Sequence, residues 1–318
     1  MEPYRLRTVA AAASSLVCAA CALVLPLAAA PDTAPDPPLW SVRDSRFVDE
    51  AALASALRAA RFRFIGEVHD DAAQHALRAR LVAALADKHP AAVMEIFDLG
   101  RDAALADAQA NGADADAMAT AGALDRAAWG WPLHRPVVAA ALSARLPIRG
   151  ANVARADLMA LARSRTAGAW QRRVAAAPWG EREDAAMRET IVESHCGALP
   201  DEAVPAIAFA QRVRDAAMAE AVAAAARDAG GAVLLAGNGH VRRDIGAPRY
   251  LQPAELPAGA ADIVSVAFIE ASAEEMRARD FPLNLVDEHP GYDYVWFTPP
   301  AARPDPCEAL KGRFRRLP

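Results

Sequence analysis

Short apolar runs that alternate with helical segments constrain the fold of this chain more than any other sequence feature. Runs of this length, bounded by Gly, Pro or polar residues, are typical of strands, and helical patterns between them indicate βαβ units. The sequence therefore predicts an α/β fold with a mainly parallel sheet flanked by helices. The predicted strands are residues 62–66, 92–97, 146–150, 231–236, 263–268 and 292–297.

The interval between the third and fourth predicted strands has no strand pattern, and its residues show helical periodicity instead. A crossover between parallel strands needs only a dozen or more residues, whereas this interval has roughly 80. We therefore expect an inserted helical subdomain at about residues 153–230.

The amino-terminal region has the pattern of a secretory signal. Two arginines precede an uncharged run over residues 9–30, which ends in small residues before a proline-rich stretch. We expect a signal peptide at residues 1–30, a proline-rich linker at residues 31–46 and a folded domain at residues 47–318. The protein would then be exported, either free in the periplasm or anchored there as a lipoprotein by a lipid on Cys21.

The charge balance disfavours nucleic acid as a partner. The chain has 35 Lys and Arg residues against 40 Asp and Glu residues, and its formal net charge is −5. Such a balance provides no general positive field for a phosphate backbone or an anionic membrane.

Two cysteines, Cys196 and Cys307, lie beyond the signal region. An oxidising compartment allows them to join, so we expect a disulfide between them. The alternative is two unrelated cysteines, one of them buried and the other in a loose carboxyl-terminal tail.

Polar side chains gather where the predicted strands end. Because ligands bind beyond the carboxyl ends of parallel strands, these side chains are candidates for one common site. Two of the exits contain a histidine three residues after a glycine, which is less expected by chance than a single histidine. The candidates are Glu67, His69, Glu95, Asn152, Asn238 and His240, together with His75 in the following helix.

Two classes of function are consistent with these residues. A divalent-metal hydrolase of the peptidase or esterase type would use Glu67, His69 and His240 as metal ligands, with Glu67 also available as the catalytic base. The other class is a binding protein in which the polar cluster holds a ligand or supports the fold. We expect His134, which follows two tryptophans, to have a structural role. The sequence has no G-x-S-x-G, Walker, H-E-x-x-H or C-x-x-C-H motif, which excludes P-loop chemistry. Whether the chain is an enzyme stays open.

Several segments together resemble the ChaN family, the iron-regulated haem-binding lipoproteins of the Tiki/TraB-like superfamily. The resemblance covers roughly residues 60–308. It is carried by the segments 66–70 (Gly-Glu-Val-His-Asp), 131–136 (Trp-Pro-Leu-His-Arg-Pro), 150–152 (Gly-Ala-Asn), 211–219, 237–248 (beginning Gly-Asn-Gly-His), 294–299 and 305–307.

This resemblance implies an exported haem-binding protein with a role in haem or iron acquisition. It also implies partners of a general kind, namely an outer-membrane haem receptor or other transport components, and a possible homodimer. Haem iron takes His or Tyr as axial ligands, and arginines pair with haem propionates. The corresponding candidates in this sequence are His69, His75, His240 and Tyr250 for the iron, and Arg242 and Arg243 for the propionates.

Overall fold

The structure is a computed structural model that describes residues 38–277, 291–305 and 307–308. An eight-stranded sheet has the order β2-β1-β8-β7-β3-β6-β4-β5. All neighbouring strands from β8 to β5 are parallel, whereas β1 runs antiparallel to both β8 and β2. The strands are β1 (Leu39–Ser41), β2 (Arg46–Val48), β3 (Phe62–Ile65), β4 (Ala91–Asp98), β5 (Ile148–Asn152), β6 (Ala232–Leu235), β7 (Ile263–Glu270) and β8 (Tyr294–Thr298).

The predicted α/β class and the mainly parallel sheet are confirmed. The structure differs from the prediction at one edge of the sheet, where β1 and β2 form an antiparallel ribbon. β1 lies within the predicted linker, residues 31–46, and β2 begins at its last residue. Leu39 and Trp40 are buried and pair with β8. Strands of three residues are too short to give a periodic signal, so the ribbon is visible only once the rest of the sheet is in place.

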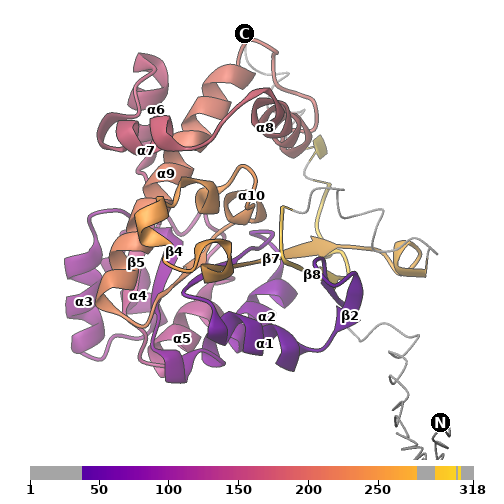
Figure 1. Ribbon diagram of the computed structural model, residues 1–318. Coiled ribbons are helices and arrows are strands. Elements are labelled where there is room, and N and C mark those ends of the chain that lie inside the picture. The colour runs from indigo at the N-terminus through magenta and orange to yellow at the C-terminus, as the bar shows by residue number, and fades with distance from the viewer. Residues whose placement is uncertain (1–37, 278–290, 306, 309–318) are drawn as a thin grey trace, which may run out of the picture. The chain divides into compact units, whose positions relative to one another are not determined.

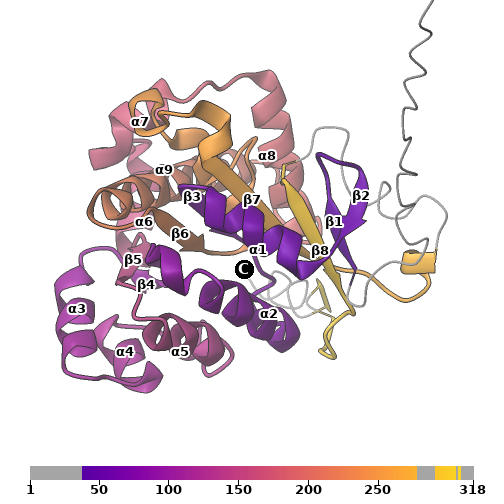
Figure 2. The same ribbon diagram turned by 60° about the horizontal axis from the view of Figure 1, so that its bottom comes forward.

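Helices cover both faces of the sheet (Figures 1 and 2). One apolar core joins the sheet to the first group of helices, and a second core joins it to the insert. The first group is α1 (Glu50–Ala59), α2 (Ala72–Ala83), α3 (Asp102–Ala110), α4 (Ala115–Ala121) and α5 (Arg135–Ser143). The insert contains α6 (Arg155–Ser164), α7 (Gln171–Ala176), α8 (Glu181–Ser194) and α9 (Val204–Asp228).

Short helical turns complete the fold. The α-helix α10 (Asn238–Val241) follows β6 directly. The 3-10 helices are Ala86–Lys88, Gly168–Trp170, Ala247–Tyr250, Pro253–Glu255, Gly259–Asp262 and Glu275–Arg277.

Helix α9 connects the insert to the sheet. Its 25 residues begin with a proline in the first turn, where the missing N–H is not needed. Its buried face is mostly alanine and valine, and small side chains allow the helix to lie close to β4, β5 and β6.

Among the described residues, no helix has both the length and the hydropathy that a membrane crossing requires.

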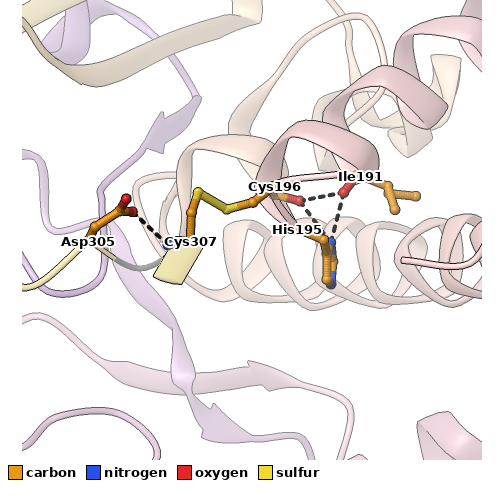
Figure 3. Close-up of a disulfide and its surroundings, with 6 residues drawn as sticks. Ile191, His195, Cys196, Asp305 and Cys307 are labelled. Carbon is orange, nitrogen blue, oxygen red and sulfur yellow. Dashed lines mark hydrogen bonds between the residues drawn. A yellow bond between two sulfur atoms is a disulfide. The ribbon is translucent and has the colours of Figure 1, made fainter. Parts of the chain in front are cut away.

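Cys196 and Cys307 form the expected disulfide, with their Cα atoms 5.5 Å apart (Figure 3). Cys196 lies just after α8, so the bond joins the insert to the carboxyl-terminal segment. The same segment is held nearby by an ion pair between Arg303 and Glu270 at the end of β7. The predicted signal peptide, including Cys21, lies outside the described residues.

Candidate functional site

The loop after β3 carries the first predicted motif. Gly66 is required there, because a Cβ atom would overlap the side chain of Asn238 and approach the backbone oxygen of Val266. Asn238 is itself fixed by hydrogen bonds to the backbone N–H and carbonyl oxygen of Phe268. Asn238, which follows β6, thus contacts both the residue after β3 and the backbone of β7, next to Glu67.

Helix α2 begins five residues after Glu67 because Asp71 caps it. The Asp71 carboxylate accepts hydrogen bonds from the backbone N–H groups of Ala73 and Gln74. This start places His75 and Arg78, three residues apart, on the buried face of the helix.

Glu67 is the centre of a buried polar cluster. Its side chain is only 2% exposed and forms an ion pair with Arg78, which is equally buried. The second carboxylate oxygen lies 2.7 Å from Nδ1 of His69, and Nδ1 of His75 lies 3.3 Å from the carboxylate. Burial lowers the pKa of His75 and of Arg78, the latter to about 9, so Arg78 still carries its charge at neutral pH.

His134, for which a structural role is expected, also lies in this cluster. It lies at the start of α5, and its Nδ1 is 3.7 Å from Glu67. Its Nε2 is buried and has no hydrogen-bond partner among the described residues. Burial and the nearby His75 and Arg78 lower the pKa of His134 to about 2, so the ring is neutral.

His69 is the exposed member of the site, with 48% of its side chain accessible. Its Nδ1 faces Glu67, and Trp129 contacts the ring edge-on with the two centroids 5.0 Å apart. Desolvation of its inner edge lowers the pKa of His69, more than the nearby Glu95 raises it, which keeps the imidazole neutral at pH 7.

A second buried cluster surrounds His240. Its Nδ1 lies 2.6 Å from Asp215 on α9, and its Nε2 lies 3.3 Å from Glu95 near the end of β4. Burial opposes a charge on this ring, but the two carboxylates outweigh it and raise the pKa of His240 to about 9. His240 and Arg214, which pairs with Glu95, hold the pKa of Glu95 well below its usual range.

The two clusters meet at Gly237. Its backbone N–H donates to Glu95 at 2.8 Å. A Cβ atom at this position would lie 3.1 Å from Nε2 of His69, so the glycine lets the edge of that ring lie close to the backbone. The structure thus brings both predicted Gly-x-x-His exits together, but in different states. His69 is exposed and neutral, and His240 is buried and protonated.

The remaining predicted residues lie around the second cluster and are already engaged. Tyr250 is fully buried, and its hydroxyl oxygen accepts a hydrogen bond from Arg212. Burial raises the pKa of Tyr250 above its ordinary value. Arg242 forms an ion pair with Asp244, and Arg243 forms one with an aspartate that precedes β8. Asn152 accepts from Arg214 and donates to an aspartate on β4.

One group of potential metal ligands is present in the described part of the chain. Glu67, His75 and His134 each offer a ligand atom, and these atoms lie within 4.8 Å of one another. This set differs from the predicted one, which combines Glu67 with His69 and His240. Arg78 already neutralises Glu67 and lies 3.3 Å from Nδ1 of His75, so a divalent cation would meet a positive charge there. The geometry favours an ion-paired cluster over a metal centre.

Sequence reasoning missed Arg78, Arg214 and Asp215 as members of the site. All three lie on helices, and nothing in their local pattern separates them from surface charges. Arg78 could have been identified from the sequence. It follows His75 by about one helical turn, so the two residues lie on the same face of a helix that begins after the cap residue Asp71. Asp215 and Arg214 reach the site only through the packing of α9 on the sheet.

Comparisons with solved structures give a match that covers most of this chain. It is described as cofacial heme binding to ChaN of Campylobacter jejuni, and it has a TM-score of 0.61 and 18% sequence identity to this chain. The match covers 81% of this chain and 94% of that protein, and at this identity it supports the fold alone. A second structure, the type III effector HopBA1, matches with a TM-score of 0.43 and 13% identity over 78% of this chain and 92% of its own.

The search of curated proteins gave no match. A family model described as haem-binding uptake, Tiki superfamily, ChaN matches residues 53–251, which include both histidine exits, the insert and α9. Since this match covers more than half of the sequence, and the fold agrees with it, the chain belongs to the ChaN family of haem-binding uptake proteins in the Tiki superfamily.

Proposed function

We propose that this protein binds haem at the carboxyl edge of its sheet and that His69 ligates the iron. The observation that carries the proposal is the state of His69. Its imidazole is neutral, 48% of its side chain is exposed, and its Nδ1 is held by Glu67. Haem bound there would supply a ferric or ferrous iron with an open axial position.

The other predicted ligands are less suited to this role. His240 has carboxylates on both ring nitrogens and is protonated at neutral pH, so it has no lone pair to offer. His75 is fully buried, and its Nε2 lies 2.9 Å from the carbonyl oxygen of His69. Tyr250 is buried with its hydroxyl against Arg212. Tyr250 could ligate iron only if its hydrogen bond with Arg212 broke and its side chain left the interior.

The surroundings of His69 suit a large, flat, apolar ligand. Trp129 stands edge-on to the His69 ring, with the centroids 5.0 Å apart, and adds an apolar side chain to the surroundings of that ring. Arg242 and Arg243 remain candidates for the propionates, although each already pairs with an aspartate.

We further infer that the protein is exported and serves haem or iron acquisition. The amino-terminal signal pattern supports export, and the disulfide between Cys196 and Cys307 suits an oxidising compartment. A receptor or transport component that delivers or accepts haem, a lipid anchor on Cys21 and a homodimer are further elements of this proposal.

A hemin titration of two matched variants tests the proposal. His89 is exposed and precedes β4, so it lies at the opposite edge of the sheet from His69. We expect the wild type and His89→Asn to give the same saturable Soret band. His69→Asn should lose that band or bind at least ~10-fold more weakly. Equal titrations for all three proteins would refute the assignment of His69.

A hydrolase remains the second candidate, and one observation favours it. A neutral, partly exposed imidazole that is oriented by a carboxylate is the arrangement of a general base. Glu67 and His69 form such a pair without any metal. Hydrolysis of ester or peptide substrates by the haem-free protein, lost in His69→Asn and insensitive to chelators, would support this candidate. Stoichiometric haem without turnover would support the first.

A further inference from the structure

We propose that the disulfide between Cys196 and Cys307 is a reducible latch for the loop after β3. The bond holds the carboxyl-terminal strap, which we define as residues 299–305, against that loop. A dithiol that reduces the bond loosens the outer part of the loop while the sheet stays folded. This inference goes beyond the proposed function, because it concerns how the loop is held and not what the loop binds.

The strap begins at a buried junction beside the loop. Thr298, the last residue of β8, is 1% exposed, and its hydroxyl oxygen accepts a hydrogen bond from the side-chain amide of Gln74 at 3.0 Å. The carbonyl oxygen of the same amide accepts from the backbone N–H of Val68 at 2.7 Å. The strap therefore starts from a fixed point that already lies next to the loop.

Arg303 attaches the middle of the strap to the loop and to the sheet. Its guanidinium donates two hydrogen bonds to the carboxylate of Glu270 at the end of β7, at 2.6 and 2.7 Å. Its Nε lies 3.3 Å from the carboxylate of Asp70 in the loop. Glu270 also accepts from the backbone N–H of Ala301 at 3.0 Å. The strap thus joins the outer part of the loop to β7.

The disulfide fixes the far end of the strap. Cys307 lies four positions after Arg303, and Cys196 lies just after α8 in the insert (Figure 3). Both cysteines are partly exposed, so a small dithiol can reach the bond. Thiol–disulfide exchange then breaks the S–S bond, leaves a thiol on each cysteine and joins the two thiols of the reductant in a disulfide.

The contacts of Arg303 depend on this bond for an entropic reason. The side chains of Arg303 and Asp70 are 22% and 54% exposed, and ion pairs at such a surface contribute little stability. Keeping the strap ordered costs conformational entropy at each of its residues. The disulfide removes much of this cost, because a strap held at both ends keeps Arg303 at a high effective concentration near its partners. Without the bond, the entropy of the strap outweighs these contacts.

Only the outer part of the loop, residues 68–70, should respond. Glu67 is held independently of the strap, because its backbone oxygen accepts from Asn238 and its carboxylate pairs with Arg78. The side chain of Asp70, by contrast, pairs with the strap itself. The latch therefore controls a short surface segment that lies between a fixed sheet edge and a fixed helix.

Hydrogen exchange of the full chain, oxidised or reduced with dithiothreitol, tests the latch. We expect residues 301–303 and 68–70 to exchange faster after reduction, the loop by about 2- to 5-fold, which is the range that loss of a surface ion pair supports. The loop between α3 and α4, residues 111–114, is the internal comparison, since it also lies at the surface and opens locally. Its exchange should be the same in both states.

Two variants separate the ion pair from the disulfide. Arg303→Gln keeps the disulfide and removes the link to Asp70. Its oxidised form should exchange at residues 68–70 as fast as the reduced wild type, and reduction should add nothing further. Arg182→Gln is the matched control, because it changes an exposed arginine on α8. It should behave as the wild type in both states.

Three results would overturn the proposal. Reduction could leave the exchange of residues 68–70 unchanged, in which case the disulfide does not control the loop. Arg303→Gln, with its disulfide intact, could keep the wild-type protection there, in which case the strap does not hold the loop. A rise of equal size at residues 111–114 would mean that reduction loosens the whole protein and that no local latch exists.

Discussion

Raising the pH through about 9 should destabilise this protein chiefly through His240. The ring is 6% exposed and lies between the carboxylates of Asp215 and Glu95, which raise its pKa from 6.5 to about 9. A raised pKa means that the folded protein holds the proton more tightly than the unfolded chain. The linked stabilisation is therefore fully present below pH 6.5 and is lost as the pH rises through about 9.

The magnitude follows from the size of that shift. One pKa unit corresponds to ~1.4 kcal/mol, so the difference between 6.5 and about 9 is linked to about 3 kcal/mol of unfolding free energy. That amount is a large part of the roughly 5–15 kcal/mol that typically holds a domain together. The positive charge on His240 also partly offsets the negative charges of the buried carboxylates of Asp215 and Glu95.

Urea denaturation at a series of pH values between about 6 and about 10 measures this effect. We expect His240→Gln to be less stable than the wild type at about pH 6.5, and the difference to shrink by about 3 kcal/mol as the pH rises. His89→Asn, at an exposed histidine, should follow the wild type throughout. Parallel pH profiles for the wild type and His240→Gln would refute the reasoning.

Further predictions concern the disulfide, the loop after β3 and the acid limb of stability. Cys307→Ser removes a bond between residues that are 111 positions apart in the sequence. On the chain-entropy model it should cost ~4–5 kcal/mol, and an unchanged urea midpoint would contradict this. Gly66→Ala should lower the stability by about 1–3 kcal/mol in thermal melts because its Cβ would overlap Asn238, whereas Gly239→Ala, with open space around the new Cβ, should not. His134 has its pKa lowered to about 2, so stability falls as the pH drops below 6.5, and His134→Gln should flatten that fall; equal acid slopes would argue against it.

Much of the fold is predictable from the sequence for a physical reason. Parallel strands are buried on both faces, so β3, β4, β6 and β7 appear as short apolar runs that need no further context. The helical insert is equally visible because its length far exceeds what a crossover requires. The β1–β2 ribbon is different. Its strands have three residues each, and only the edge of β8 gives them partners.

The site is predictable only in part. Topology alone places Glu67, His69 and His240 at one edge, because parallel strands end on the same side of the sheet. It does not say that His240 is buried and protonated while His69 is exposed and neutral. The protonation of His240 comes from Glu95 and from Asp215 on α9, and the contact with Asp215 depends on how that helix is rotated against the sheet.

The most direct test of the account is to identify the nitrogen that binds the iron. Hyperfine-resolved EPR of the ferric haem complex, prepared with ¹⁵N-labelled histidine, detects coupling from a ligating imidazole. We predict coupling from one histidine in the wild type and in His89→Asn, and its loss in His69→Asn. Coupling that persists in His69→Asn, or a complex without any histidine coupling, would contradict the account.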